Sequence, residues 1–564
     1  MNTGPNAMGV LSPGALAPPF PAGYHIGMTN TKFGRPAAVL FSLLFPLIPF
    51  QGAYAQSAAY TELLSGSETP NVPVPEAPQA VYGTISGNKS FVSRDSERIM
   101  KMSDEALAAV PPDQKIKMLK TLMRDSTPNQ NNSDGPDLDQ QNLEKAILRV
   151  LGSAPDAASF DYVYYRLDQG TLERSVGWYK DIKNLANKYR GTVVPGDWEG
   201  LRRYVDAVTK TTTAGRNFIK FLIDGREVLP VMMPAMQAAT KSIHIEIFQL
   251  QPDNIGWGLA KILCERAKAG VTVRFLIDEH GSKAEHDPEL QKLVAALRES
   301  GATVIIKEPS AHFEGHLDHR KVIVIDGRTA FTGGMNLGSD YQEKWHDQQT
   351  LVVGPAVTKL QEAFLERWQN AGGKYSSAED LFPALAESSD GSETQVVGHI
   401  GHSDQNLKAV YIRAIGTAQK TVRIATPYFT DKDVINALRA AAKRGVKVQL
   451  VFPKENNIPI VQSAARANYP ALIKAGVEVY EYKGRMAHLK VAAIDGVWAT
   501  FGSSNLDTRS MKNNDELNLV INDPRIAEDI ETRLFGMDIP QSERITHYSP
   551  SIMDHFANQF GGLL

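Results

Sequence analysis

The chain has 564 residues, enough for roughly two to four domains, and its contents of 42% hydrophobic and 22% charged residues are ordinary for a globular protein. Its formal net charge of −3 argues against a nucleic-acid partner, because no overall basic field is available to attract phosphates. The single cysteine, Cys264, excludes an intramolecular disulfide framework and any zinc site built from several cysteines. It lies in an apolar helical pattern, and we interpret it as a core residue.

An export signal is predicted within the segment 1–55. Lys32 and Arg35 precede an apolar run at residues 37–50, and the run is followed by Ala53-Tyr54-Ala55, which has the small-x-small form of a cleavage site. We therefore assign residues 1–55 to an N-terminal extension and signal peptide, and expect an exported protein, periplasmic or secreted. An uncleaved membrane anchor is the alternative for the same segment.

Residues 56–210 are predicted to form a small helical region. Apolar residues from Leu143 to Leu151 recur on one face of a helix, and the aromatic residues between Phe160 and Tyr189 are expected to pack in a helical core. Asp197 occupies the N-cap position of the next helix. The sequence does not indicate a role for this region.

Two stretches with the same order of elements follow, residues 211–395 and 396–564, and they predict an α/β protein built from two similar halves. In the first, strands at 217–223, 242–250 and 271–277 alternate with helices, one of them at 256–269. In the second, helices at 406–418 and 432–444 alternate with strands at 421–426 and 446–452. Strands alternating with helices of this length are typical of parallel or mixed sheets.

A polar pattern occurs once late in each half, with identical spacing. Counted from a histidine, a lysine lies at +2, an aspartate of an Asp-Gly pair at +7, an asparagine at +17 and a carboxylate at +28. The matched residues are His319, Lys321, Asp326, Asn336 and Asp347 in the first half, and His488, Lys490, Asp495, Asn505 and Glu516 in the second. A repeat that keeps polar residues at fixed offsets indicates a repeated active site.

The spacing suggests how these residues are held. Each His-x-Lys begins an apolar run, so we expect a buried strand from which the histidine and lysine project on the same face. The Asp-Gly pair is expected to close that strand in a tight turn, which gives Asp326 and Asp495 a mainly structural role.

The residue types point to chemistry on a phosphate. Lysine and asparagine supply hydrogen-bond donors for phosphoryl oxygens, and two histidines can act as nucleophile and as acid. We expect each carboxylate to orient the histidine of its own half, Asp347 for His319 and Glu516 for His488. Lysine beside the histidines repels a cation, so we expect neither a metal nor another cofactor.

The two H-x-K-x4-D sequences, residues 319–326 and 488–495, resemble those of the phospholipase D superfamily, and their flanks are similar to bacterial cardiolipin synthases and related phospholipases. The resemblance covers about residues 218–522. It implies a sandwich of two α/β halves with one active site at their interface, and a metal-independent reaction through a phosphohistidine.

By the same resemblance the catalytic residues are His319, Lys321, Asp326, His488, Lys490 and Asp495. His319 is expected to be the nucleophile and His488 the acid and base, although the sequence itself does not distinguish them. Phosphoryl oxygens are expected to contact Lys321, Asn336, Lys490 and Asn505.

The leading hypothesis is an enzyme that hydrolyses or exchanges the head group of glycerophospholipids at a membrane surface, with water or an alcohol as acceptor. A secreted nuclease with the same active site is the alternative, and a binding protein with a decayed site is disfavoured because both motifs are complete. The sequence indicates neither the head group, nor the balance of hydrolysis and transfer, nor the oligomeric state. No amphipathic helix suited to a membrane surface is evident in it.

Overall fold

The computed structural model describes residues 92–126, 138–175, 179–190, 192–307 and 316–561. The predicted export signal lies outside these ranges, as does the chain up to residue 91. Within the described ranges, no helix is both long and apolar enough to cross a bilayer.

The helical region shares its core with the second half. Its described helices are α1 (Arg94–Met100), α2 (Asp104–Ala109), α3 (Pro112–Ser126), α4 (Leu138–Gly152), α5 (Ala157–Tyr164), α6 (Gln169–Ser175), α7 (Tyr179–Arg190) and α8 (Trp198–Thr209). The predicted helical core forms, with Leu143, Phe160 and Tyr189 buried, and Asp197 caps α8. The same hydrophobic cluster continues into residues 397–520, so this region and the second half are packed together.

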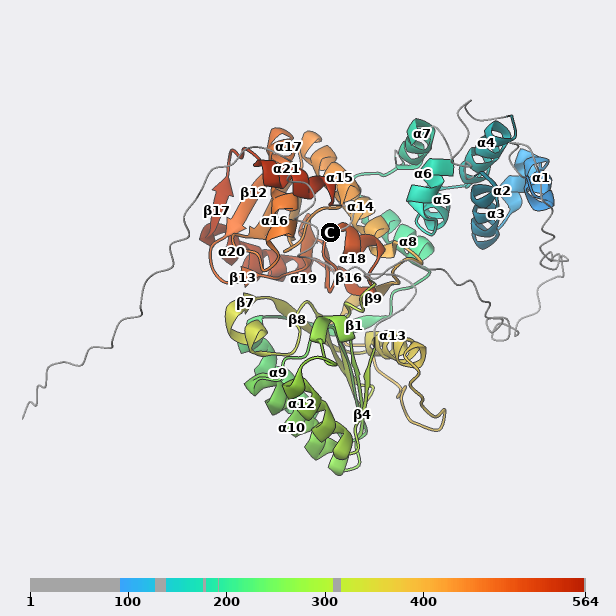
Figure 1. Cartoon of the computed structure of the whole chain (residues 1–564). Coiled ribbons are helices and arrows are strands. Elements are labelled where there is room, and N and C mark those ends of the chain that lie inside the picture. Colours follow the sequence, from blue (N-terminus) through green and yellow to red (C-terminus); the bar gives the residue numbers. More distant parts are fainter. Residues whose placement is uncertain (1–91, 127–137, 176–178, 191, 308–315, 562–564) are drawn as a thin grey trace, which may run out of the picture. The chain divides into compact units, whose positions relative to one another are not determined.

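A single mixed sheet of fifteen strands contains both predicted halves, and its strand order repeats on either side of the centre (Figure 1). Outwards from the centre, the first half contributes β1 (Arg216–Ile223), β8 (Gln348–Val353), β6 (Thr329–Gly333), β5 (Val322–Ile325), β2 (Ser242–Ile247), β3 (Thr272–Ile277) and β4 (Thr303–Ile306). The second half contributes, in the matching order, β9 (Ser392–His399), β16 (Glu516–Asn522), β15 (Trp498–Gly502), β14 (Val491–Ile494), β10 (Thr421–Ala425), β11 (Lys447–Pro453) and β12 (Glu478–Tyr482), with β17 (Ser542–Ile545) at the edge.

The pairing directions also match. β2, β3 and β4 run parallel to one another, as do β10, β11 and β12, and the strands nearer the centre are antiparallel. β1 and β9 join the halves over only two residue pairs. The α/β fold with two similar halves is confirmed, and the boundary that we placed after residue 395 falls within β9.

Helices cover both faces of the sheet. In the first half, α9 (Asp224–Gln237), α10 (Asn254–Lys268) and α12 (Pro288–Glu299) lie on one face and α13 (Ala356–Asn370) on the other (Figure 1). The helices of the second half are α14 (Asn406–Thr417), α15 (Lys432–Lys443), α16 (Pro459–Arg466), α17 (Tyr469–Lys474), α18 (Thr508–Lys512), α19 (Pro524–Ile530), α20 (Gly536–Gln541) and α21 (Ile552–Gln559). Phe364 of α13 belongs to the same core as Phe501 and Leu534, so α13 packs the halves against each other.

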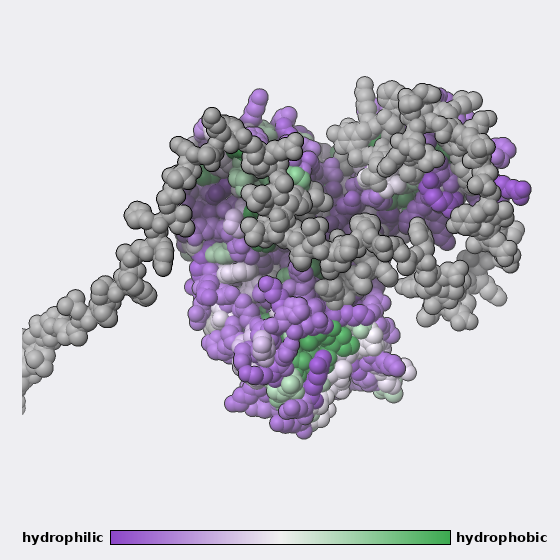
Figure 2. All heavy atoms as spheres, viewed as in Figure 1, coloured by the Kyte–Doolittle hydropathy of each residue, from purple (hydrophilic) through white to green (hydrophobic). Residues whose placement is uncertain are grey.

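The remaining short elements are α11 (Glu279–Ser282), β7 (Trp345–His346), β13 (Met486–Ala487) and the π-helical turns η1 (Asp340–Lys344) and η2 (Glu531–Phe535). On the face shown in Figure 2 the described surface is mainly hydrophilic, with one hydrophobic patch close to the positions of β8 and β1 in Figure 1.

The turns after the motif strands have the predicted form. Asp326 and Gly327 have φ of +53° and +63°, and Asp495 and Gly496 have φ of +55° and +67°. In each turn a backbone N–H donates back across the turn, from Arg328 to Ile325 at 3.0 Å in the first. Positive φ at both central positions defines a type I′ turn, for which Asp-Gly is well suited.

Candidate active site

Each His-x-Lys pair lies immediately before a central strand. His319 and Lys321 precede β5, His488 and Lys490 precede β14, and all four side chains are buried. In both motifs the lysine ammonium donates to the backbone carbonyl of its own histidine. Lys490 Nζ also lies 3.0 Å from Nε2 of His488, so this histidine and lysine share a face as predicted.

Two short parallel bridges connect the motif of one half to the carboxylate segment of the other. The N–H of His319 donates to the carbonyl of Asp515 at 3.0 Å, and the N–H of His488 donates to the carbonyl of His346 at 2.7 Å. The residue after each of these acceptors is a +28 carboxylate. The bridges therefore place each carboxylate beside the histidine of the opposite half.

The predicted pairing of carboxylates with histidines is consequently wrong. His319 Nδ1 lies 3.0 and 3.1 Å from the two carboxylate oxygens of Glu516, and His488 Nδ1 lies 2.7 Å from Oδ2 of Asp347. We had assigned each carboxylate to its own half because the +28 offset is the same in both. The site is instead interleaved, and neither half holds a complete histidine–carboxylate pair.

Both histidines are neutral at neutral pH when no ligand is bound. Burial lowers the pKa of His319 to about 4, although Glu516 acts in the opposite direction. Burial and the charge of Lys490 lower the pKa of His488 well below its usual value. Because each Nδ1 faces a carboxylate, Nε2 is the atom that each histidine presents for chemistry.

The two lysines, Lys321 and Lys490, make the site suitable for binding an anion. Burial lowers the pKa of Lys321 to about 8 and that of Lys490 to about 7. A phosphodiester bound between them would favour the protonated forms of lysine and histidine, because its negative charge opposes the cost of burying a cation.

The two carboxylates differ in their hydrogen-bond donors. Glu516 accepts hydrogen bonds from the hydroxyls of Ser503 and Ser510, which lie at +15 and +22 from His488. The positions at the same offsets from His319 hold Gly334 and Tyr341, which do not supply such a hydroxyl to Asp347.

The acidities of the two groups also differ. Burial raises the pKa of Asp347 to about 7, despite the opposing charge of Lys490. Burial also acts to raise the pKa of Glu516, but His319, Lys321 and Ser503 outweigh it and the pKa is lowered. Asp347 therefore has the higher pKa of the two carboxyl groups.

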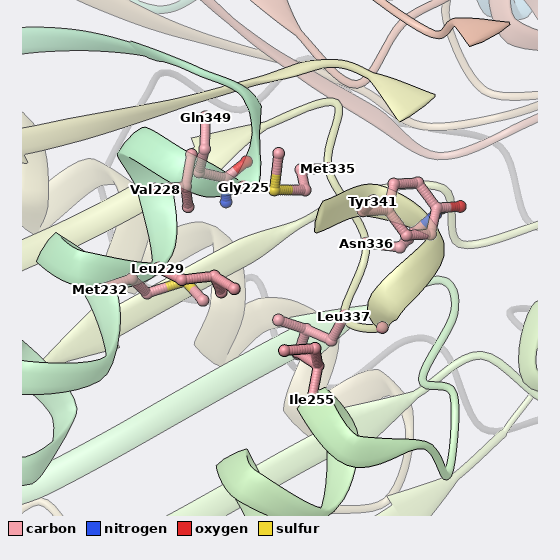
Figure 3. Close-up of a pocket in the computed structure, with 11 residues that line it drawn as sticks. Gly225, Val228, Leu229, Met232, Ile255, Met335, Asn336, Leu337, Tyr341 and Gln349 are labelled. Atoms are coloured by element: carbon pink, nitrogen blue, oxygen red, sulfur yellow. The ribbon is translucent and has the colours of Figure 1, made fainter. Parts of the chain in front are cut away.

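The two asparagines follow the return strands as predicted. Asn336 donates through Nδ2 to the Tyr341 hydroxyl at 2.6 Å, and its Oδ1 accepts from the N–H of Gln249. Figure 3 shows Asn336 and Tyr341 side by side at one end of a small pocket with mainly apolar walls. Asn505 Oδ1 is buried without a hydrogen-bond partner among the described residues. Contact of either asparagine with a phosphate stays a prediction.

Asp326 and Asp495 lie at the far ends of β5 and β14, about 16 Å along the strand from the lysines. The Asp326 carboxylate accepts hydrogen bonds from three consecutive backbone N–H groups, those of residues 240–242, at 2.7 to 2.9 Å at the closest oxygen. Asp495 binds the N–H groups of residues 419–421 in the same way, at 2.7 to 2.8 Å. This geometry places neither carboxylate at the histidines and agrees with the structural interpretation.

Aromatic rings surround the histidines and were not identified from the sequence. The ring centroid of Phe248 lies 4.9 Å from that of His319. Those of Trp345 and Tyr428 lie 4.6 and 6.2 Å from the imidazole of His488. Trp345 could have been noticed, because it lies just before His346 and Asp347, whereas Phe248 and Tyr428 carry no local signal.

Two buried ionic bridges behind the histidines were also missed. Arg367 Nε lies 2.9 Å from Asp318 and 3.6 Å from Asp515, the residues that form one of the two bridges between the halves. His346 lies at the other bridge and binds a carboxylate through each ring nitrogen, at 2.7 and 3.1 Å. The residues of each ionic bridge lie far apart in the sequence, for example His346 and Asp538, so only the fold brings them together.

Comparisons with known proteins agree with this geometry. Residues 232–368 and 411–537 match the family described as "Cardiolipin synthase, PLD-like domain". The chain is 32% identical over 365 residues to "Probable cardiolipin synthase YwiE" of Bacillus subtilis (strain 168), over 61% of this chain and 72% of that protein. It is 34% identical over 307 residues to "Cardiolipin synthase" of Geobacillus kaustophilus (strain HTA426), over 53% of this chain and 61% of that protein. A crystal structure of phosphatidylserine synthase from Haemophilus influenzae Rd KW20 aligns with a TM-score of 0.48 at 16% identity, over 64% of this chain and 98% of that one.

Two repeated α/β halves that share one pair of His-x-Lys motifs define the protein class as the phospholipase D superfamily. Within that class, the chain belongs to the cardiolipin synthase family with the PLD-like domain.

Proposed function

We propose that this chain is a phosphatidyltransferase of the cardiolipin-synthase type, which acts on glycerophospholipids at a membrane surface through a phosphohistidine. The observation that carries the proposal is the interleaved pair of histidines, each with Nδ1 held by a carboxylate of the opposite half. One Nε2 from each half, neither of them held by the carboxylate, suits a displacement in two steps at one phosphorus. The substrate class follows from the names of the relatives.

In the first step His319 Nε2 attacks phosphorus. A P–N bond forms, the P–O bond to the head-group alcohol breaks, and His488 gives its Nε2 proton to the departing oxygen. We assign these roles from the carboxylates. The lowered pKa of Glu516 suits a carboxylate that holds the Nδ1–H of His319 and leaves its Nε2 lone pair free, whereas the raised pKa of Asp347 suits a carboxyl group that passes a proton to His488.

In the second step an acceptor hydroxyl attacks the phosphohistidine. The new P–O bond forms, the P–N bond breaks, and His488 takes the acceptor's proton. With the primary hydroxyl of a second phosphatidylglycerol as acceptor, the products are cardiolipin and glycerol. With water, the product is phosphatidic acid. We propose that transfer is the main reaction, since the named relatives are synthases.

Product analysis with defined lipids tests this function. Full-length protein is incubated with vesicles of phosphatidylglycerol or phosphatidylethanolamine, with and without glycerol, and with and without a chelator. We expect cardiolipin and free glycerol from phosphatidylglycerol, and phosphatidylglycerol from phosphatidylethanolamine plus glycerol, at rates that the chelator does not change. A chain that leaves both lipids intact but cleaves DNA without metal would be a nuclease, the alternative that the relatives do not favour.

We also propose that the chain is exported and that cleavage leaves Gln56 at the mature N-terminus. The residue pattern of the segment 1–55 supports this. Mass spectrometry of the exported protein tests it, and an intact apolar run in the membrane fraction would support an anchor instead.

A further inference from the structure

Two exposed apolar segments lie on the second half. The start of α16 exposes three successive residues, the N-cap Ile458 and the first helical residues Pro459 and Ile460. The C-terminal helix α21 exposes a larger set, with Ile552 90% and Phe556 48% accessible. α16 packs directly against α21, so the segments form one surface. We call this surface the apolar rim, and its members are Ile458, Ile460, Ile552, Met553, Phe556 and Phe560.

The polarity of α21 is the reverse of that of an ordinary surface helix. Its buried side includes Asp554, which is fixed by a capping box with Ser551 and by the Tyr548 hydroxyl at 2.9 Å. Its large apolar side chains point outwards, and the rings of Phe556 and Phe560 pack on each other at 4.9 Å. A soluble helix normally buries such side chains, and their exposure as a group marks a surface that meets another apolar phase.

The rim adjoins the active site at two places. Just before α16, Asn457 accepts a hydrogen bond of 2.8 Å from the hydroxyl of Tyr428, whose ring faces His488. At the other end, Gly561, the residue after Phe560, lies against Thr430. The N–H of Thr430 in turn donates to the carbonyl beside Asn505, that of Leu506. The rim thus borders the wall of the active site at the carboxyl ends of β10 and β11, where ligands commonly enter α/β sheets.

We propose that the apolar rim docks into the outer part of a lipid bilayer and holds the active-site entrance at the lipid surface. This deepens the proposed function and rests on it, because the substrate is taken to be a membrane lipid. The position of the apolar rim next to the active site favours a bilayer as its partner. A second copy of the chain, or its own apolar run at residues 37–50, would cover the entrance that the substrate uses, whereas a bilayer covers the rim and also supplies the substrate.

A local fluorescent probe tests docking. Cys264 is the only cysteine of the chain, so Cys264→Ala provides a background for one added thiol. An environment-sensitive dye is attached at Met553→Cys on the rim or, as control, at Phe382→Cys. Phe382 is 48% exposed, as Phe556 of the rim is. It lies beside the Asp326 turn, at the end of the sheet away from the histidines.

With phosphatidylglycerol vesicles, we expect a blue shift and quenching by lipid-borne nitroxides at position 553 and neither at 382. This readout is independent of any membrane contact made by the N-terminal segment. Equal responses at both positions, or none at 553, would overturn the proposal.

Activity provides a second test. Phe556→Ser combined with Phe560→Ser is compared with Phe382→Ser, on phosphatidylglycerol in vesicles and on a short-chain form dispersed as monomers. We expect the rim variant to lose roughly tenfold or more on vesicles, since each buried phenylalanine contributes strongly to partitioning, and to keep its rate on monomers. The control should keep both rates.

The outcomes separate docking from chemistry. Equal losses on both substrates would assign the rim a structural role, and a rim-dependent dimer in sedimentation velocity without lipid would assign it to a second copy; either overturns docking. Insertion of the dye at position 553, together with no lipid product from the wild-type chain, would instead uphold docking and reject the proposed function.

Discussion

At the scale of single residues, the two histidine–carboxylate pairs differ in the carboxylate itself, Glu516 or Asp347, and in the two serine hydroxyls that only Glu516 receives. Ser503 and Ser510 donate to Glu516, and their counterparts Gly334 and Tyr341 leave Asp347 without such donors. A hydrogen bond to the charged form stabilises it. The serines are therefore one source of the asymmetry between nucleophile and acid, and they lie outside the H-x-K-x4-D motif.

Ser503→Ala tests this asymmetry. Loss of the hydroxyl should raise the pKa of Glu516, whose folded pKa is held below its usual value. Because the ionised form is needed, activity lost on acidification should then be lost at higher pH than in the wild type. A hydrogen bond to a charged group is worth about 1.5–3 kcal/mol, so the acid limb should move up by about one to two pH units.

The measurement is the pH profile of kcat/KM. Thr500→Val is the matched control, since Thr500 has a buried hydroxyl on β15, just before Ser503, that donates to the carbonyl of Leu519. It should leave the acid limb of the profile in place. A Ser503→Ala profile that coincides with that of the wild type would contradict the role given to the hydroxyl.

The two histidines should respond differently to the same substitution. His319→Asn should abolish the phosphoenzyme. His488→Asn should retain attack on a substrate with a nitrophenolate leaving group, because the help of a general acid, typically ~10²–10⁴-fold, is not needed there. Since His488 also activates the acceptor, this variant should accumulate phosphohistidine.

Trapping and mapping the acid-labile phosphoenzyme measures this. A label on His488 in the intact enzyme would reverse the two roles. A reaction that needs metal and forms no phosphohistidine at either position would reject the mechanism.

The ten matched polar residues could be predicted from the sequence, but their partners could not. Equal +28 offsets are compatible with carboxylates that serve their own half or the other one. The choice is made by the bridges of His319 to Asp515 and of His488 to His346, which are contacts between distant segments. Ser503 lies 15 residues after His488, where the first half has Gly334, so the signal for asymmetry was present in the sequence.

At the scale of elements, the strands and helices that we expected in both halves lie close to the observed ones. Their apolar periodicity and the turn residues at their ends indicate the same boundaries. The strand expected over residues 242–250 is the clearest difference, since β2 ends at Ile247. Beyond it the chain leaves the sheet to line the site with Phe248 and Gln249. An apolar pattern does not show where hydrogen bonding to a neighbouring strand stops.

The Asp-Gly turns should matter for stability rather than for chemistry. Asp326→Asn leaves one acceptor oxygen for three backbone N–H groups, and we expect a loss of about 1–3 kcal/mol in the free energy of unfolding. Backbone donors hold the pKa of Asp326 below its usual value against the effect of burial. The stabilisation is therefore present above about pH 4, the unfolded value, and is lost as pH falls below it.

Urea unfolding at pH 7 and pH 3 measures the effect. The difference between wild type and Asp326→Asn should shrink at the lower pH, and kcat of the folded variant should stay within about twofold. Asp380→Asn, an exposed partner of Lys241, is the control and should cost less than about 1 kcal/mol. Unchanged stability with lost activity would place Asp326 in the chemistry.

At the scale of the whole molecule, the active site depends on how the halves are joined. Each histidine and its carboxylate come from different halves, and a buried cationic side chain spans two carboxylates at each junction. Arg367 spans Asp318 and Asp515 near His319, and His346 spans Asp224 and Asp538 near His488. A small shift of one half against the other would therefore separate both pairs at once.

One ionic bridge between the halves uses an arginine, Arg367, and the other a histidine, His346. Because only the histidine can lose its charge, this difference predicts how the contact between the halves responds to alkaline pH. Burial alone would lower the pKa of His346, but hydrogen bonds to Asp224 and Asp538 raise it to about 9. Its contribution is therefore fully present below about pH 6.5, the unfolded value, and is lost as pH rises through 9. A shift of this size corresponds to about 3 kcal/mol.

His346→Gln should accordingly destabilise the protein at pH 7 and differ little from the wild type at pH 10. Arg367→Gln is the matched control, because guanidinium stays charged throughout this range and its effect should persist at pH 10. Chemical denaturation of the full chain at both pH values measures the two differences. Because the N–H of His488 bonds to the carbonyl of His346, the wild type should also lose activity reversibly over the same alkaline range. A destabilisation by His346→Gln that is equal at pH 7 and pH 10 would show that the imidazole joins the halves without its charge.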